Sequence, residues 1–114
     1  MEAASFDIHG DEGAGEVRIV IGGELDLDSA PRLQRTAEKL LKDEPRRLVL
    51  DLSALRFIDS SGLRVMILLH ERSLREGWQL QVARPPAPVL RIFQISGMDE
   101  HLNLIDADAT DEAP

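Results

Sequence analysis

Hydrophobic and polar positions alternate along the first part of the chain. Ser5–His9 alternates weakly and Glu16–Ile21 strongly, with Val17, Ile19 and Ile21 on one side. A period of two residues is typical of a strand with one buried face, and the glycines between the two segments are typical of a turn. We therefore predict an N-terminal β-hairpin.

The spacing of apolar positions then changes to that of a helix. Asp28 or Ser29 can cap this helix, Pro31 suits its first turn, and Pro45 stops it. The apolar positions between these signals fall on one buried helical face, and they are Ala30, Leu33, Ala37, Leu40 and Leu41.

Apolar strands and helices alternate through the rest of the chain. Arg47–Leu52 and Trp78–Val82 are predicted strands, the first of them apolar enough for the middle of a sheet covered on both faces. A helix between them ends at Gly77, a short helix ends before Gly97, and Leu102–Ile105 is a possible edge strand. In the helix that ends at Gly77, the residues that recur with helical period are Leu63, Met66, Ile67, His70 and Leu74.

That second helix is apolar beyond a single face. Val65, Leu68 and Leu69 are hydrophobic as well, so the first two turns are apolar nearly all round. Either the helix is central and buried, or part of it is a docking surface.

The order of elements predicts the fold class. Strands that alternate with helices after a hairpin favour a small α/β domain, with a mixed sheet of hairpin and parallel strands packed with about four helices. With 114 residues, 43% of them hydrophobic, the chain is of single-domain size and can bury one core. We expect the domain to span residues 1–106 and the acidic end, residues 107–114, to be disordered.

Charge and composition narrow the function. The net charge of −8 repels phosphate backbones, so we expect no nucleic-acid partner. The chain has no cysteine, which excludes disulfides, thiolate catalysis and cysteine metal sites. No apolar run reaches the roughly 18 residues of a membrane span, and the acidic start does not match a signal peptide, so a cytoplasmic protein is expected.

The segment F-I-D-S-S-G-L, Phe57–Leu63, is the most informative stretch. A strand that ends near Ser53 and a helix that begins near Ser61 place Asp59 and Ser60 at a helix N-terminus, where unpaired N–H groups attract oxygen atoms. Asp59 or Ser60 could cap the helix, a role worth about 1 kcal/mol. Alternatively, Ser60 could be phosphorylated, and the added charge of about −1.5 to −2 would then repel a partner.

Enzymatic and metal-binding interpretations are weaker. D-L-D-S-A, Asp26–Ala30, begins like the motif of haloacid-dehalogenase phosphatases and like a calcium loop, but Ala30 and Pro31 stand where those motifs need other residues. The chain lacks G-x-S-x-G, its three histidines are isolated, and no His–Asp pair has an evident place near Ser60. We therefore expect no enzyme activity, no metal site and no cofactor.

Three segments carry a resemblance to a known family. L-V-L-D-L-S-A-L-R-F-I-D-S-S-G-L, Leu48–Leu63, resembles the signature of STAS-domain proteins, and among them of the bacterial anti-sigma factor antagonists. G-E-L-D, Gly23–Asp26, falls where that family has the same tetrapeptide, and I-F-Q-I-S-G-M, Ile92–Met98, extends the likeness over nearly the whole chain. The resemblance implies the STAS fold.

The resemblance also implies a mechanism. In that family the unphosphorylated antagonist binds an anti-sigma factor, which is also a GHKL-type serine kinase, and so frees a sigma factor. The kinase phosphorylates the serine that maps onto Ser60, the complex dissociates, and a PP2C-type phosphatase restores the antagonist. The implied partner-binding residues are Asp26, Asp59, Ser61, Gly62 and Leu63.

A second role remains possible within the same family. STAS domains also serve in stress-signalling scaffolds and as regulatory subunits of lipid-transport ATPase complexes, without sigma-factor release. The short chain and the intact D-S-S-G favour the antagonist. An antagonist is expected to be a monomer or a weak dimer, whereas a scaffold is expected to form a large assembly.

Overall fold

A computed structural model describes residues 4–11 and 15–106, so the expected disordered end at 107–114 lies outside the described residues. Within these ranges the chain forms one mixed sheet in the order β1-β2-β3-β4-β5. β1 is antiparallel to β2, and every later neighbouring pair is parallel. The strands are β1 (Ser5–Asp11), β2 (Glu16–Leu25), β3 (Arg47–Ile58), β4 (Gln79–Ala83) and β5 (Leu104–Ile105).

The predicted hairpin is confirmed. β1 and β2 pair in register from Ser5 opposite Gly22 to Asp11 opposite Glu16. Ile19 and Ile21 on β2 are fully buried, as their alternation predicts.

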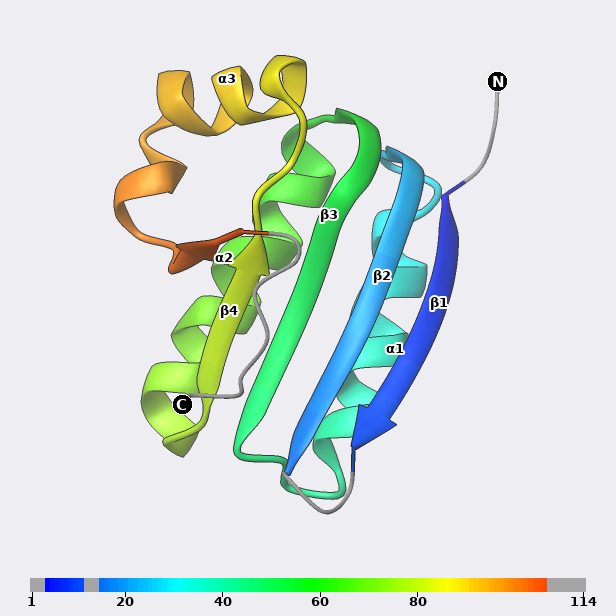
Figure 1. Ribbon diagram of the computed structural model, residues 1–114, viewed down its shortest axis with the longest axis vertical. Helices are drawn as coiled ribbons and strands as arrows, with labels where there is room; N and C mark the ends of the chain where they lie inside the picture. The colour runs from blue at the N-terminus through cyan, green and yellow to red at the C-terminus, as the bar shows by residue number, and fades with distance from the viewer. Residues whose placement is uncertain (1–3, 12–14, 107–114) are drawn as a thin grey trace.

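Helices pack on the sheet as Figure 1 shows, with α1 and α2 behind the strands and α3 near one end of β3 and β4. About four helices were expected, and the described residues hold three α-helices and one 3₁₀ turn. Gly97 ends α3 with a φ of 80°, and only a single turn follows it. The bounds are α1 (Ala30–Leu41), α2 (Ser60–Glu76), α3 (Ala87–Ser96) and the 3₁₀ turn Met98–Glu100.

The third strand is longer than predicted. The expected end near Ser53 is wrong, because β3 continues to Ile58 alongside the second half of β2. The register between β2 and β3 shifts on both sides of Gly22 and Gly23, so the pairing continues through an irregular stretch. Asp59 is therefore the only residue between β3 and α2, and the helix begins at Ser60 instead of Ser61.

The buried face of α2 also differs from the predicted one. Val65, Met66 and Leu69 are buried, whereas Ile67 and Leu74 are 41% and 72% exposed. Nearly all sides of the first two turns are apolar, so the sequence period alone cannot select the face that meets the sheet. Part of the helix is thus core and part is an exposed apolar surface.

One hydrophobic core joins the sheet and the helices. It includes side chains of β2, β3 and β4, of all three α-helices and of the 3₁₀ turn. Its fully buried side chains include Leu33 of α1, Leu50 of β3 and Phe93 of α3. Among the described residues, no helix has the length and apolar content of a membrane span.

Candidate functional site

The N-terminus of α2 is capped by Asp59. Its Oδ1 accepts hydrogen bonds from the backbone N–H of Ser61 at 2.8 Å and of Gly62 at 3.3 Å. Its backbone is extended, with φ −114° and ψ −170°, as is usual for the residue that precedes a helix. Of the two capping residues that the sequence allows, the structure selects Asp59.

Ser60 is thereby left without a capping role. It is the first residue of α2 and is exposed. Within the described ranges its hydroxyl makes no hydrogen bond, and the N–H groups of Ser61 and Gly62 already have Asp59 as their acceptor. The hydroxyl therefore faces solvent at the surface, where a modifying enzyme can reach it.

A second turn lies beside this helix start. The N–H of Asp59 donates to the carbonyl oxygen of Leu25 at 3.1 Å, which ties the end of β3 to the end of β2. Asp26 follows directly, and its Oδ1 accepts from the N–H of Asp28 at 3.1 Å and of Ser29 at 3.2 Å. These bonds give the Asp26 turn a defined shape next to Ser60.

Buried Ser29 completes that turn. Its hydroxyl donates to the carbonyl oxygen of Glu24 at 2.8 Å and accepts from the N–H of Asp26 at 2.9 Å. Ser29 is the residue before α1, as the sequence predicts, but its side chain makes no capping bond to the helix. The hydroxyl instead links both ends of the turn.

The two turns enclose an open hollow, which we call the acidic hollow. It has a volume of about 490 Å³ and is lined by Glu24, Asp26, Leu27, Asp28, Phe57 and Asp59. Leu27 is 74% exposed and Phe57 is 45% exposed, so apolar surface lies among the carboxylates. A binding partner that complements this surface would carry both basic and apolar side chains.

The sequence indicated only part of this hollow. Asp26 and Asp59 were expected at the site and lie together in it. Leu27 and Phe57 were not predicted as site residues, because an apolar residue next to a strand end is usually part of the core. Among the described residues, no group of three or more His, Asp or Glu side chains is placed to hold a metal ion.

The remaining predicted site residues are less accessible. Ser61 and Leu63 are half-buried, and Gly62 is buried. A Cβ atom on Gly62 would lie 2.7 Å from Cγ1 of Ile58 and 2.9 Å from Cγ of Leu25. Gly62 is therefore needed for close packing of α2 against the ends of β2 and β3, whereas a partner would meet Ser60 and the acidic hollow.

The fold matches that of a known domain family. The family model described as "Mlab, STAS domain" matches residues 8–106, so the chain belongs to the STAS-domain family. Its relatives include the anti-sigma-F factor antagonist RsfB of Mycobacterium tuberculosis, 30% identical over 90 residues that cover 79% of this chain and 73% of RsfB. The anti-sigma-B factor antagonist of Bacillus subtilis is 29% identical over 99 residues, which cover 85% of each chain.

Solved structures agree with this assignment. An anti-sigma factor antagonist from Mycobacterium paratuberculosis superposes with a TM-score of 0.80 at 26% identity, over 97% of this chain and 91% of the other. Unphosphorylated SpoIIAA, at 18% identity and a TM-score of 0.70 over 95% of this chain and 92% of its own, shares the fold. The expected STAS fold is confirmed, and the group that these relatives form is regulatory and not catalytic.

Proposed function

We propose that this chain is an anti-sigma factor antagonist that switches partners through phosphorylation of Ser60. One observation carries the proposal: the exposed, unbonded hydroxyl of Ser60 stands at the start of α2 beside the acidic hollow. Relatives at 29% and 30% identity that bear the name anti-sigma factor antagonist support it.

The unphosphorylated form binds an anti-sigma factor. Its contact surface centres on the acidic hollow, where the exposed side chains of Leu27 and Phe57 provide apolar area among carboxylates. Carboxylates that surround apolar side chains favour a partner with arginine or lysine around an apolar centre. Sequestering the anti-sigma factor frees a sigma factor for transcription.

Phosphorylation acts on this contact and leaves the fold intact. The N–H groups of Ser61 and Gly62 already donate to Asp59, so a phosphate on Ser60 does not replace an internal bond. It adds about −1.5 to −2 charges beside the carboxylates of the hollow. A partner surface that packs closely against a neutral hydroxyl then loses affinity, because the phosphate is larger than the hydroxyl and must give up its water at a place where that surface has no cation.

The family resemblance adds a second role for the anti-sigma factor and one further partner. The anti-sigma factor itself is the kinase, of the GHKL type, and a PP2C-type phosphatase removes the phosphate from Ser60. Such a cycle needs ATP and therefore takes place in the cytoplasm. Asp26, Asp59, Ser61 and Leu63 form the surface around the phosphate, while Gly62 holds the helix start in position.

The test is a binding experiment with Ser60 variants and the anti-sigma factor kinase of the same genome. Ser60→Asp should weaken the complex at least about tenfold by calorimetry, a loss of about 1.4 kcal/mol, with an almost unchanged melting temperature. Ser60→Ala should bind and remain bound when ATP and magnesium are added. Intact-mass spectrometry of the unaltered chain should show one added phosphate, which fragmentation locates on Ser60.

Ser5→Asp is the matched control, because it adds the same charge at an exposed serine on β1. It should bind like the unaltered chain. If Ser60→Asp binds normally but melts at a much lower temperature, the Ser60 hydroxyl is structural and the proposed switch is wrong.

A further inference from the structure

A second hollow lies between β1 and α1, apart from the Ser60 site. It has a volume of about 370 Å³ and is lined by Phe6, Arg32, Arg35, Thr36, Lys39 and Leu40. No acidic residue is among these six side chains. We call it the basic hollow, and its sign is opposite to the net charge of −8 of the whole chain.

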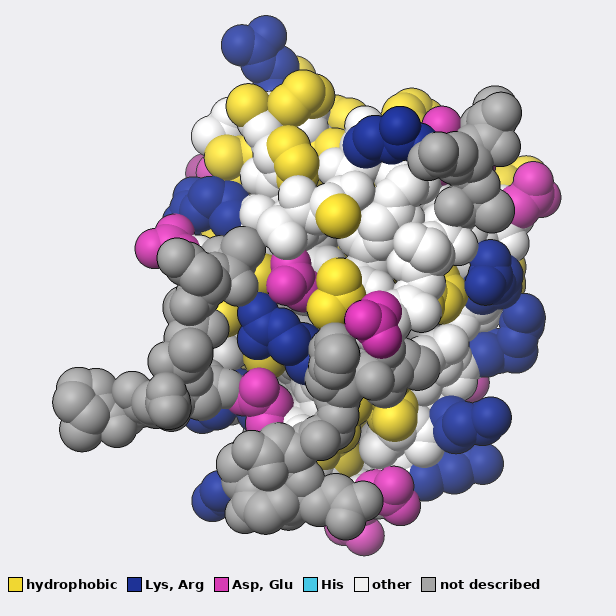
Figure 2. Space-filling model, turned by 45° about the vertical axis from the view of Figure 1, so that its right-hand side comes forward, with side chains coloured by type: hydrophobic (Ala, Val, Ile, Leu, Met, Phe, Trp, Pro, Cys, Tyr) yellow, Lys and Arg dark blue, Asp and Glu magenta, His cyan; other side chains and the backbone are white. Residues whose placement is uncertain are grey.

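Three cations of α1 define this hollow. Arg32, Arg35 and Lys39 are three and four residues apart, so they follow one side of the helix over about 10 Å. Figure 2 shows lysine and arginine side chains in a column along the right-hand edge of the molecule. Within the described residues none of the three forms an ion pair, although the chain has 21 acidic and 13 basic side chains.

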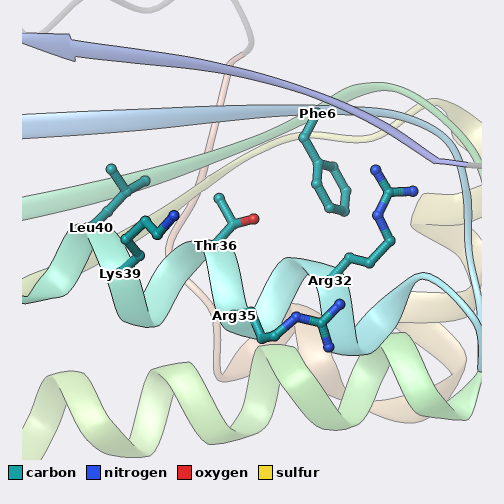
Figure 3. A pocket seen from close by; sticks show the side chains of 6 residues that line it. All are labelled: Phe6, Arg32, Arg35, Thr36, Lys39 and Leu40. Atoms are coloured by element: carbon teal, nitrogen blue, oxygen red, sulfur yellow. The ribbon is translucent and has the colours of Figure 1, made fainter.

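Arg32 is already held in place. Its Nη1 donates to the carbonyl oxygen of Ala4 at 3.3 Å, and its guanidinium carbon lies 5.0 Å from the centre of the Phe6 ring. Figure 3 shows Phe6 pointing from β1 toward α1, with Arg32 beside the ring and the Arg35 side chain running along the helix toward Arg32. A guanidinium has five N–H groups, so most of those on Arg32 remain available to a ligand.

Apolar side chains complete the wall. Phe6 and Leu40 are half-buried and pack against the core from the two elements that border the hollow. A ligand that fits must therefore offer anionic groups to the helix and an apolar portion to these two side chains. Hollows of this size accept small molecules, and a few charged groups on an apolar wall are typical of such sites.

We propose that the basic hollow binds a small organic anion with two phosphate-type groups and an apolar portion. Arginine pairs with phosphate oxygens through two parallel hydrogen bonds, and two such groups match cations spread over about 10 Å. A large anionic surface would be repelled by the net charge of the chain. A small ligand inside the hollow experiences mainly the local charges, because salt screens the others beyond about 8 Å.

This site does not depend on the proposed role of Ser60. None of its lining residues belongs to the acidic hollow, and its anionic ligand is chemically the opposite of a basic partner surface. A failure of one proposal therefore leaves the other intact.

The experiment is a titration of the ¹⁵N-labelled full chain, followed by amide chemical shifts. Inorganic pyrophosphate tests the charge requirement, and phenyl phosphate compared with inorganic phosphate tests the apolar wall. Pyrophosphate should shift amides of α1 and β1, and phenyl phosphate should bind more tightly than inorganic phosphate. Vesicles of phosphatidylcholine and phosphatidylglycerol in equal parts distinguish a free phosphorylated compound from a lipid headgroup.

The variant for this test removes two cations from the hollow. Arg35→Gln combined with Lys39→Gln should weaken pyrophosphate binding about tenfold or more, because hydrogen bonds to charged groups are lost. Lys42→Gln combined with Arg91→Gln removes the same charge at two exposed positions outside the hollow and should leave the affinity unchanged.

Three results would overturn the proposal. They are the absence of shifts in α1 and β1 at millimolar pyrophosphate, equal loss of affinity in both double variants, and binding to vesicles without binding to either soluble probe. The last result would assign the cations of α1 to a membrane surface.

Discussion

Among single residues, Gly62 separates a structural requirement from a binding role. Its missing side chain leaves room for Ile58 and Leu25, which a Cβ atom would approach to 2.7 Å and 2.9 Å. Gly62→Ala should therefore reduce the free energy of unfolding by about 1–3 kcal/mol through overpacking. Urea unfolding followed by circular dichroism measures this change.

The sign of the Gly62→Ala effect is informative. Alanine is a better helix former than glycine by about 1 kcal/mol, so a helix start with free space would become more stable. A gain in stability would show that α2 can move away from Ile58 and Leu25. Arg64→Ala, at an exposed position one turn into the same helix, should change the stability by less than about 0.5 kcal/mol.

The hydrogen bonds of Asp59 allow a second prediction, on the stability of its variants. Asp59→Ala leaves the N–H groups of Ser61 and Gly62 without an acceptor and should cost about 0.5–2 kcal/mol of stability. Asp59→Asn keeps a side-chain oxygen at the same place and should recover most of that loss. If both variants unfold at the same urea concentration as the unaltered chain, the two hydrogen bonds do not contribute to stability.

The sequence identified the D-S-S-G segment as the helix start, but not which of its residues caps the helix and which stays exposed. The helix start at D-S-S-G follows from the order of strand, polar pair and apolar helix, and it is confirmed to within one residue. Which residue caps depends on backbone angles that the sequence does not show. Leu27 and Phe57 were not predicted as site residues, because their exposure depends on where β2 and β3 end.

Among the elements, α2 is the one in which sequence patterns were least decisive. Its length and its end at Gly77 follow from glycine, which adopts the left-handed conformation there with a φ of 83°. The face that it buries depends on tertiary packing at Gly62, and an apolar period cannot report it. β3 likewise exceeds its predicted end because pairing with β2 extends a segment whose residues are partly exposed.

The end of α2 allows a pH prediction. Trp78 donates from its indole N–H to the carboxylate of Glu76 at 3.0 Å, and Arg72 donates to the other oxygen at 2.9 Å. These bonds, first that of Trp78 and then that of Arg72, lower the pKa of Glu76 below the ordinary glutamate value. Their stabilising effect is complete above that ordinary value and is lost as the pH falls through the lowered pKa.

Trp78 can report this titration because it is the only tryptophan of the chain. Its fluorescence should change with a midpoint below the ordinary pKa of glutamate, and the change should be absent in Glu76→Gln. A transition that persists in Glu76→Gln would belong to another carboxyl group. Glu71→Gln, five residues earlier on the same helix, is the control that should keep the transition.

In the whole molecule, charge is distributed unevenly. The chain as a whole carries a net charge of −8. It nevertheless has a basic hollow, whose lining residues are all different from those of the acidic hollow. Composition gives the net negative charge of the chain but no sign of the basic hollow, because a net charge averages over the molecule. The position of Arg32, Arg35 and Lys39 on one helix side is visible in the sequence, but the hollow that they border requires the packing of β1 onto α1.

The single core predicts cooperative unfolding of the described domain. Buried side chains of three strands and three helices belong to one cluster. None of these elements can therefore unfold by itself without exposing apolar surface of the others. Urea transitions followed by Trp78 fluorescence, at the junction of α2 and β4, and by far-ultraviolet circular dichroism should therefore coincide.

A core variant at the far end of the chain tests this coupling. Phe93 is fully buried on α3, and Phe93→Ala should cost about 3–5 kcal/mol through the lost contacts and the cavity. If the domain unfolds as one unit, the loss must shift both transitions by the same amount, although Trp78 lies between α2 and β4 and not on α3. A shift in circular dichroism without a shift in fluorescence would mean that α3 detaches by itself, and that the α3 end of the domain is a separate cooperative unit.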